Sequence, residues 1–570
     1  MTSLTDFVTS SATKYLQSVV FVDDHIYHKD DKPLETAVSI AGGLKPQFVK
    51  PEVAEGDAAL ESEASAVNGE SGGNSGDGDT VEGDYHPRQL MESFAQKGIV
   101  CALYEPKENF ATDPDSEIFR LCERADVIIL DWDLHTDGGD GVSQLLAELI
   151  KKSQSESPHH VRYCAIYTSQ QSLHRIIDEL LEKLKHRGCG VHVEDQKLQL
   201  IAGATRISIF GKPSSLSRTE DDAKYEIPER ELAGKVIDEF SKLHHGILPA
   251  FALHGLASVR RNTKRLLDKF NGDLDGAFLL HRALVMNESE AFDELPELLS
   301  DEIRAVLEDS WPSSFPISDV ASSAIDGLAL ENPYPTWTNK GAAYDGKATF
   351  QRFLKEGRKA LYDARNDCDQ LANVGEKSFQ GIKPKLLIGL ESMVSKGDWS
   401  GPELLAGLFC NRTQYGGDSR RLHFGTVVRH RMNGGDAWSF SLCLMPICDS
   451  QRLKKAHDFP FWRLKDNPKC GVDQKRYGIA VEASGGAKTL AAGGKMRDML
   501  WIAKFAPGTS EWVTAANHDG VFKFVSAGIE VEWVAELKPL HAQRIAAHMG
   551  TDVSRVGLVE SEWLRLFCDR

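Results

Sequence analysis

The segment VIILDWD, residues 127–133, carries the strongest structural signal in this sequence. Four consecutive apolar residues are typical of a short strand that is buried on both faces, as in a parallel sheet. Asp131 follows directly, so the strand would present a carboxylate at its carboxyl end. Parallel sheets bind ligands at that end of their strands. The segment therefore predicts a parallel sheet with an acidic site along one edge.

The same pattern recurs on both sides of this segment. Three further apolar runs each end in a polar residue: VVFV (19–22) before Asp23 and Asp24, AIY (165–167) before Thr168, and ISIFG (207–211) before Lys212. A fifth strand is expected at 99–104, and helical periodicity is found between the strands at 87–97, 116–124, 142–152 and 172–186. Strands that alternate with helices at this spacing predict an α/β fold whose sheet is covered on both faces.

The polar residues at the strand ends suit the transfer of a phosphoryl group to a carboxylate. Sites with two or three carboxylates suit Mg²⁺, which prefers oxygen ligands and neutralises the approach of an anionic phosphoryl group. A lysine can offset charge on that group, and a hydroxyl can hydrogen-bond it. The ordered set therefore predicts a Mg²⁺-dependent phosphoacceptor site, with these members: Asp23, Asp24, Asp131, Thr168 and Lys212.

The motifs VVFVDD, VIILDWDL…GGDG, IYTS and FGKP make residues 1 to about 215 resemble a response-regulator receiver domain. The resemblance implies a flavodoxin-like (βα)5 fold with a parallel sheet. It implies that a sensor histidine kinase phosphorylates Asp131, that Lys212 pairs with the phosphoryl group, and that Thr168 is the switch hydroxyl. Pro213 matches the cis Lys-Pro bond that is frequent in the family. The resemblance also implies the Mg²⁺ ligands, namely Asp24, Asp131, the backbone carbonyl of Asp133 and, through water, Asp23.

Some features depart from the usual receiver pattern. The loop after Asp131 is longer than usual, and Asp133 adds a carboxylate that could raise the acceptor's pKa or act as a surrogate acceptor. Ile209 stands three residues before the lysine, where the family usually has an aromatic switch residue, and Phe210 is next to it. This departure argues against the usual aromatic output relay.

Haloacid-dehalogenase-type phosphatases are the main alternative for the N-terminal region. They also combine a strand-end DxD motif with Thr or Ser, Lys and an acidic pair around Mg²⁺, but the DxD comes first in their chains and the acidic pair last. Here the acidic pair, Asp23 and Asp24, comes first, and His135 stands where those phosphatases usually have Thr or Val. The order favours the receiver.

Charge and composition restrict the other functions. The net charge is −18, and ten acidic residues with no basic ones lie between Pro51 and Asp84. An acidic surface repels phosphate backbones, which argues against nucleic-acid binding. Residues 29–85 are rich in Gly, Ser and Asp and are expected to form a disordered insertion. Ten scattered cysteines, a polar N-terminus and the lack of a long apolar stretch favour a cytoplasmic protein without a membrane partner.

The rest of the chain predicts further domains. The expected order is a receiver (1–225), a helical region (226–320), a connector (321–383) and an α+β C-terminal domain of unknown function (384–570). Periodicity predicts helices at 232–243, 260–270, 274–286 and 298–307. The C-terminal region is expected to contain strands at 424–429, 438–446, 477–481, 499–503 and 521–533, then a helix at 539–549 and a tail at 560–567.

A second resemblance rests on the atypical receiver and on two later segments, RRNTKRLLDKFNGDLDGAFLLHRAL (260–284) and ELKPLHAQRIAAHMGTDVSRVGLVESEWLRL (536–566). Together they resemble large receiver proteins of bacterial two-component-type defence systems such as Detocs. This resemblance implies a regulator or phosphate sink in phage defence. Its partners would be a sensor histidine kinase and a second response regulator or effector.

Two hypotheses remain for the C-terminal half. In the first, it binds a partner or buffers the phosphate. In the second, it is an unrecognised enzyme that the receiver gates. A pocket that unites the first suspects would favour the enzyme, and their dispersal would favour an interaction module. These suspects are Arg412, Asp418, Arg420, His423 and His430.

Overall fold

The computed structural model describes residues 3–26, 87–156, 160–194, 198–213, 217–285, 290–310, 317–326, 337–339, 342–344, 355–356, 401–415, 417, 419–432, 435, 437–466, 477–483, 486–492, 496–508 and 511–554. The chain divides into two compact units, Met1–Ala324 and Ile325–Arg570, each described by itself. The acidic insertion expected at 29–85 and the tail expected at 560–567 lie outside the described residues, as does most of the connector expected at 321–383.

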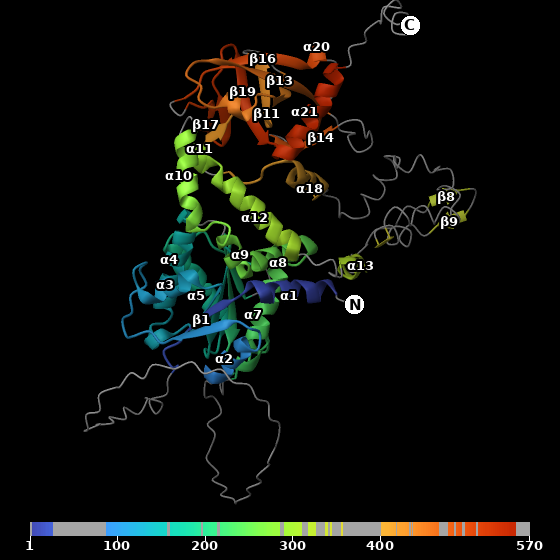
Figure 1. The fold of residues 1–570 in the computed structure, drawn as a ribbon. Coiled ribbons are helices and arrows are strands. Elements are labelled where there is room, and N and C mark those ends of the chain that lie inside the picture. Colours follow the sequence, from blue (N-terminus) through green and yellow to red (C-terminus); the bar gives the residue numbers. More distant parts are fainter. Residues whose placement is uncertain are drawn as a thin grey trace, which may run out of the picture. The chain divides into compact units, whose positions relative to one another are not determined.

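The first unit is built on a sheet with the strand order β2-β1-β3-β4-β7-β6-β5. Figure 1 shows helices packed around this sheet. Its first five strands are parallel neighbours, and they are β2 (Val100–Tyr104), β1 (Ser18–Val22), β3 (Val127–Leu130), β4 (Arg162–Thr168) and β7 (Thr205–Gly211). This is the flavodoxin-like order. The predicted α/β class and the predicted strands are therefore confirmed.

One edge of this sheet differs from the sequence prediction. The strands β5 (His192–Val193) and β6 (Gln199–Ala202) pair antiparallel with each other, and β6 pairs antiparallel with β7. The expectation of a wholly parallel sheet is wrong at this edge, because strands of two and four residues are too short to show a periodic pattern.

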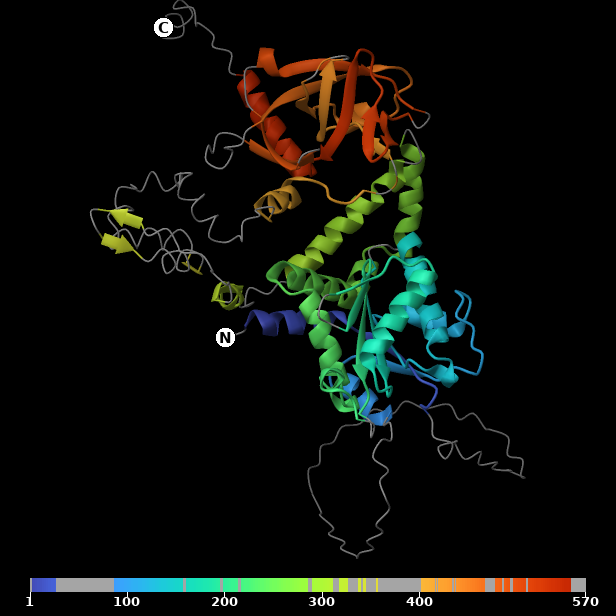
Figure 2. The ribbon, with the colours of Figure 1, turned by 180° about the vertical axis from the view of Figure 1, so that it is seen from behind.

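Two hydrophobic cores cover the faces of the sheet. Successive side chains of a strand alternate between its faces. Val20 and Val22 of β1 therefore enter one core, while Val19 and Phe21 enter the other. The first core includes residues of α3 (Glu117–Arg124), α4 (Asp140–Glu156) and α5 (Leu173–His186). The second includes residues of α1 (Leu4–Tyr15), α2 (Pro87–Ala95) and α7 (Glu229–Leu243). Figure 2 shows the same layers from behind.

Helix α7 belongs physically to this sheet. The sequence places it in a helical region that starts at 226. However, its apolar face packs in the second core through Leu232, Val236 and Phe240. Tyr15 of α1 stacks on Phe240 with ring centroids 6.0 Å apart. The domain boundary at about 225 stays a prediction, but the cover of the sheet is completed beyond it.

The helices after α7 follow the sequence prediction in part. Helix α8 (Ile247–Arg261) ends at Asn262, whose side-chain Nδ2 donates to the Ser258 carbonyl at 2.8 Å. The single helix expected at 260–270 is therefore wrong, since α9 begins separately at Thr263. The remaining helices of this unit are α6 (Glu220–Ala223), α9 (Thr263–Leu267), α10 (Asp275–Leu284), α11 (Glu290–Asp293), α12 (Leu295–Ser310) and α13 (Ile317–Asp326).

The second unit is β-rich with a few helices, as expected. Its main sheet has the order β10-β17-β18-β19-β11-β12-β13-β15-β14, and β16 also pairs with β13. Its strands are β10 (Ser419–Arg421), β11 (Thr426–Met432), β12 (Ser439–Cys443), β13 (His457–Asp466), β14 (Tyr477–Ala483), β15 (Gly486–Ala492), β16 (Leu500–Phe505), β17 (Thr514–His518), β18 (Val521–Phe524) and β19 (Ile529–Glu536). The strand-like stretch expected at 521–533 is two strands, because Gly528 turns the chain with a φ of 77°.

Helices and a hairpin complete this unit. Helix α21 (Pro539–Ser554) packs Ala542, Ile545 and Met549 into one of the two cores of the sheet. The other elements are α18 (Gly401–Cys410), α19 (Ile447–Ser450), α20 (Met496–Met499) and the hairpin β8 (Trp337–Asn339) with β9 (Ala342–Tyr344). Among the helices in the described ranges of both units, none is long and apolar enough to cross a bilayer.

Candidate functional site

The carboxyl ends of four parallel strands of the first unit meet at the same end of its sheet. The predicted site residues lie there in the order that the sequence gives: Asp23 and Asp24 after β1, Asp131 after β3, Thr168 at the end of β4 and Lys212 after β7. Backbone hydrogen bonds continue across these ends. The Asp131 N–H donates to the Val22 carbonyl at 2.9 Å, and the Lys212 N–H donates to the Thr168 carbonyl at 2.7 Å. The topology therefore brings the predicted residues together.

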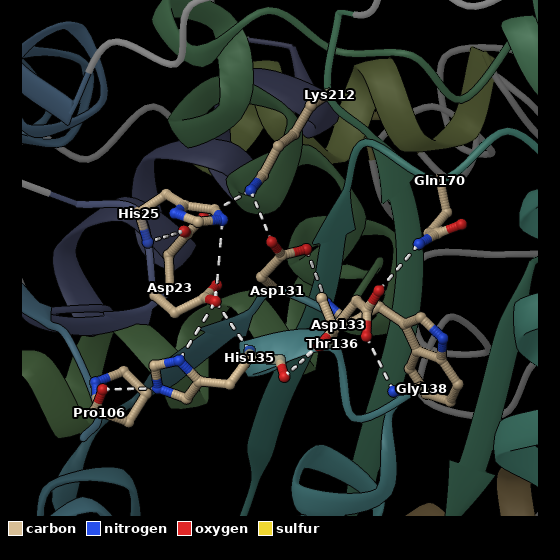
Figure 3. Close-up of polar contacts among 12 residues, drawn as sticks. Asp23, His25, Pro106, Asp131, Asp133, His135, Thr136, Gly138, Gln170 and Lys212 are labelled. Carbon is tan, nitrogen blue, oxygen red and sulfur yellow. Dashed lines mark hydrogen bonds and ion pairs between the residues drawn. The ribbon is translucent and has the colours of Figure 1, made fainter. Parts of the chain in front are cut away.

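Three carboxylates crowd these strand ends, and Figure 3 labels two of them, Asp23 and Asp131. One oxygen each of Asp23, Asp24 and Asp131 lie within 4.8 Å of one another. Asp23 and Asp131 are buried, and the side chain of Asp24 is only 5% exposed. The buried Oδ1 of Asp24 has no hydrogen-bond partner among the described residues. Like charges at this separation repel each other, so the cluster suits a cation.

Lys212 supplies one positive charge to the cluster. Its Nζ donates to Asp23 Oδ2 at 2.5 Å and to Asp131 Oδ2 at 3.1 Å. Burial lowers the pKa of Lys212, but the charges of Asp131 and Asp23 outweigh it, so this pKa is raised and the amine stays protonated. Burial raises the pKa of Asp131; the Lys212 charge opposes this rise and the Asp23 charge adds to it. One lysine thus leaves the three carboxylates incompletely neutralised.

Thr168 is buried at the end of β4. Its hydroxyl oxygen accepts the Gln170 N–H at 3.3 Å, a long hydrogen bond that does not use the hydroxyl proton. The proton therefore stays available as a donor. This is compatible with the hydroxyl role that the resemblance assigns to Thr168, which stays a prediction.

The carboxylate of Asp133 is turned away from the other three (Figure 3). Its Oδ1 accepts the Gly138 N–H at 2.8 Å, and its Oδ2 accepts from Gln170 Nε2 at 3.2 Å. The Asp133 side chain therefore stabilises the loop that follows β3, instead of joining the cluster of three carboxylates. These bonds weigh against Asp133 as a surrogate acceptor, while the role of its backbone carbonyl as a metal ligand stays a prediction.

The loop after Asp131 contains a residue that sequence reasoning missed. His135 has a φ of 54°, a left-handed conformation that is uncommon outside glycine. Three contacts hold it there. Its backbone N–H donates to Asp24 Oδ2 at 2.8 Å, its Nδ1 lies 3.6 Å from the same oxygen, and its Nε2 lies 2.9 Å from the Pro106 carbonyl. Because a carbonyl only accepts, Nε2 carries the proton. His135 thus fixes Asp24 against the loop that follows β2.

Glycine is required a few residues further along this loop. Gly139 has a φ of 79°, and a Cβ there would overlap the ring of Trp132, which is buried. Lys183 of α5 lies 5.4 Å from the centroid of that ring and donates to the Gly138 carbonyl at 2.6 Å. The glycines in the motif GGDG therefore let the loop fold tightly over Trp132, the residue next to Asp131.

The peptide bond after Lys212 corrects one expectation. The described residues contain no cis peptide bond, so Lys212–Pro213 is trans. The Lys212 carbonyl oxygen is engaged by Nη1 of Arg218 at 2.6 Å. This arginine was also missed, since nothing in the local sequence pattern distinguishes it from a surface charge.

The suspects in the second unit do not converge. Arg412 and His423 both lie near Glu536, whereas Arg420 stacks on aromatic rings, with its Cζ 4.1 Å from the centroid of Phe522. His430 is buried, and its Nε2 lies 2.9 Å from Ser441 Oγ. A cavity of about 690 Å³ in this unit is lined by Arg412 but by none of the other described suspects. Asp418 lies outside the described residues.

A comparison with known families agrees with the geometry of the first unit. Residues 15–217 match the family model of the response receiver domain. This segment, rather more than a third of the chain, is therefore a receiver domain. No curated protein and no solved structure matches the chain.

Receiver domains typically bind Mg²⁺, and the residues present fit that ion. The donor set consists of hard carboxylate oxygens, which Mg²⁺ prefers over nitrogen or sulfur. The unpartnered, buried Oδ1 of Asp24 is a free ligand within the cluster. A divalent cation would also relieve the repulsion among the three carboxylates.

Proposed function

We propose that this protein is a response-regulator-type phosphoacceptor, in which Asp131 receives a phosphoryl group from the phosphohistidine of a sensor histidine kinase. The observation that carries the proposal is the cluster of Asp23, Asp24 and Asp131 with Lys212 between two of its members. An acidic cluster without such a lysine would hold a cation but would lack a group to pair with the incoming phosphoryl oxygens.

The chain's own residues account for the transfer. In the reaction the P–N bond of the phosphohistidine breaks and a P–O bond to Asp131 forms. The Trp132 N–H donates to Asp131 Oδ1 at 2.8 Å, which orients the attacking carboxylate. Lys212 would exchange its bond to Asp131 for one to the phosphoryl group. Thr168 would donate its hydroxyl proton to that group.

Mg²⁺ would be held by Asp24 and Asp131, with Asp23 acting through water and the backbone carbonyl of Asp133 completing the protein ligands. When bound, it offsets the negative charge that carboxylate and phosphoryl group bring together. Asp24 is pre-positioned for this task by the His135 N–H.

The particular role we propose is that of a regulator or phosphate sink in a bacterial two-component-type defence system, with a second response regulator or effector as a further partner. This rests on the resemblance of the later segments to such proteins. It is supported by Ile209, which is fully buried in the first core where receivers usually place a rotating aromatic side chain. An aliphatic side chain that is packed on all sides has no exposed rotamer to switch to. A protein that only stores phosphate does not require such a switch, whereas one that signals through an aromatic relay does.

The dispersal of the described suspects in the second unit supports an interaction role over a gated enzyme. Burial, followed by the charge of Arg463, lowers the pKa of His430 to about 4. Its ring also packs on Trp501 with centroids 4.3 Å apart. His430 is thus engaged in the interior of the β-domain and is not displayed to a substrate.

The test is phosphorylation of the full chain by labelled acetyl phosphate and by a phosphorylated kinase, with and without Mg²⁺. We expect Asp131→Asn to abolish labelling and EDTA to do the same for the wild type. Asp133→Asn is the matched control two residues away, and it should retain labelling because its carboxylate is committed to the loop. Label that persists in Asp131→Asn but disappears in Asp133→Asn would contradict the assignment of the acceptor.

A further inference from the structure

Arg218 contacts the backbone at the two strand ends that carry Thr168 and Lys212. Its side chain is 1% exposed, although it is placed only a few residues after the end of β7. Two features make it unusual: it bonds backbone oxygens of the candidate site, and it is a buried cation outside the group of residues assigned to the reaction. Burying the charge of an arginine costs free energy, so a buried arginine must form hydrogen bonds and ion pairs that compensate for the lost hydration.

All five N–H groups of the guanidinium are used. Nη1 donates to the Lys212 carbonyl at 2.6 Å and to Glu226 Oε2 at 2.5 Å. Nη2 donates to the Thr168 carbonyl at 3.1 Å and to the Gln170 carbonyl at 3.2 Å, and Nε donates to the same Gln170 oxygen at 3.2 Å. A lysine has three donors on one nitrogen and could not reproduce this planar fork. The site therefore requires arginine.

The sequence leaves room for this side chain at one point of β7. A Cβ on Gly211 would lie 2.8 Å from Arg218 Cζ, so glycine is needed for the guanidinium to lie against the strand. The Gly211 N–H and carbonyl pair with Tyr225 and Ile227, both at 2.9 Å. The segment with Glu226, the acid that balances Arg218, is thereby held at the same strand end.

We infer that Arg218 is a positioning residue that fixes the backbones of Thr168 and Lys212 relative to each other. Both are assigned contacts with the phosphoryl group in the proposed function, and their carbonyls are held by one rigid group. The Thr168 carbonyl accepts the Lys212 N–H and Arg218 Nη2 together, so both of its acceptor positions are occupied. This inference rests on the proposed function, and it assigns Arg218 no contact with the phosphoryl group or with Mg²⁺.

The experiment compares Arg218→Lys with wild type in the full chain. If Arg218 positions Thr168 and Lys212 but not the carboxylates, phosphorylation by acetyl phosphate should slow by about tenfold or more, as expected for misplaced groups. The Mg²⁺ affinity measured by calorimetry should stay unchanged. Hydrogen exchange at the Lys212 amide, which donates to Thr168, should become faster.

The matched control is Arg206→Lys, on the other end of the same strand, where the arginine bonds the Gly203 and Thr205 carbonyls. It should leave the rate and the Lys212 amide unchanged. Gly211→Ala displaces the guanidinium from the opposite side and should reproduce the Arg218→Lys result. It also keeps the test open if Arg218→Lys prevents folding.

Two results would overturn the inference. One is a phosphorylation rate in Arg218→Lys equal to that of the control. The other is a loss of rate that simply follows a loss of Mg²⁺ binding or of folded protein. Failure of the proposed function gives a different signature: wild type would take no label, while the exchange measurement would still report whether Arg218 fixes the Lys212 backbone.

Discussion

The crowding of carboxylates predicts that removal of one of them stabilises the protein when Mg²⁺ is absent. Asp24→Asn is the informative change. Lys212 forms its ion pairs with Asp23 and Asp131, so this substitution removes repulsion among the carboxylates without breaking either ion pair. The asparagine oxygen can still accept the His135 N–H, which now lies 2.8 Å from Asp24 Oδ2. The amide nitrogen would replace the unpartnered Oδ1 and could donate to a neighbouring carboxylate.

The size of the effect follows from the separation of the charges. The ligand atoms lie within 4.8 Å of one another, and at that distance an effective dielectric constant of about 20 gives about 3.5 kcal/mol for a like-charged pair. Lys212 offsets part of this repulsion. Replacing a charge-assisted hydrogen bond by a neutral one costs about 1 kcal/mol. We expect Asp24→Asn to raise the free energy of unfolding by about 1–3 kcal/mol. For a domain of this size, each kcal/mol raises the Tm by roughly 2–4 °C.

The assay is calorimetric unfolding of the full chain with EDTA and with Mg²⁺. Wild type should gain stability with Mg²⁺, and Asp24→Asn should start higher but gain little. Asp221→Asn is the control for charge alone, since that side chain is 78% exposed. If Asp24→Asn melts below wild type in EDTA and still gains fully from Mg²⁺, then the three carboxylates are not in repulsion and do not share a cation.

Two further predictions concern other parts of the chain. In a urea titration, Gly139→Ala should lower the free energy of unfolding of the receiver by about 2 kcal/mol or more, because its Cβ would overlap Trp132. Gly138 also has a positive φ, but the space around it is open. Gly138→Ala should therefore cost only about 1 kcal/mol in the same titration. In the second unit, His430 has a depressed pKa of about 4 against 6.5, so its contribution to stability is present above pH 6.5 and is lost as the pH falls toward 4. His430→Gln should flatten this part of the pH profile, and an unchanged profile would contradict the assignment.

The strand ends of the receiver could be predicted because each signal is local. A run of apolar residues predicts a strand buried on both faces, and the polar residue that follows it marks the strand's end. Asp23, Asp131, Thr168 and Lys212 were located in this way, and the parallel topology then brings them together. No knowledge of side-chain contacts was needed for that step.

What the sequence could not predict depends on contacts between distant residues. Asp133 looks like a second acceptor in the motif DWD, and only its bonds to Gly138 and Gln170 turn it away. Arg218 is separated by 50 residues from Thr168, whose carbonyl it binds, and no periodicity marks such a pair. The apolar face of α7 was visible in the pattern, but the surface on which it packs was not.

The crowding of charge around Asp131 explains why these missed contacts matter. Three crowded carboxylates and the left-handed His135 both cost stability, so without further contacts the strand ends would relax and Asp24 would turn to solvent. His135 prevents this on one side through Asp24 and the Pro106 carbonyl. On the other side Arg218 fixes the Thr168 backbone but holds none of the three carboxylates. The carboxylates are thus kept crowded mainly through His135, and part of the binding energy of a cation would be the relief of their repulsion.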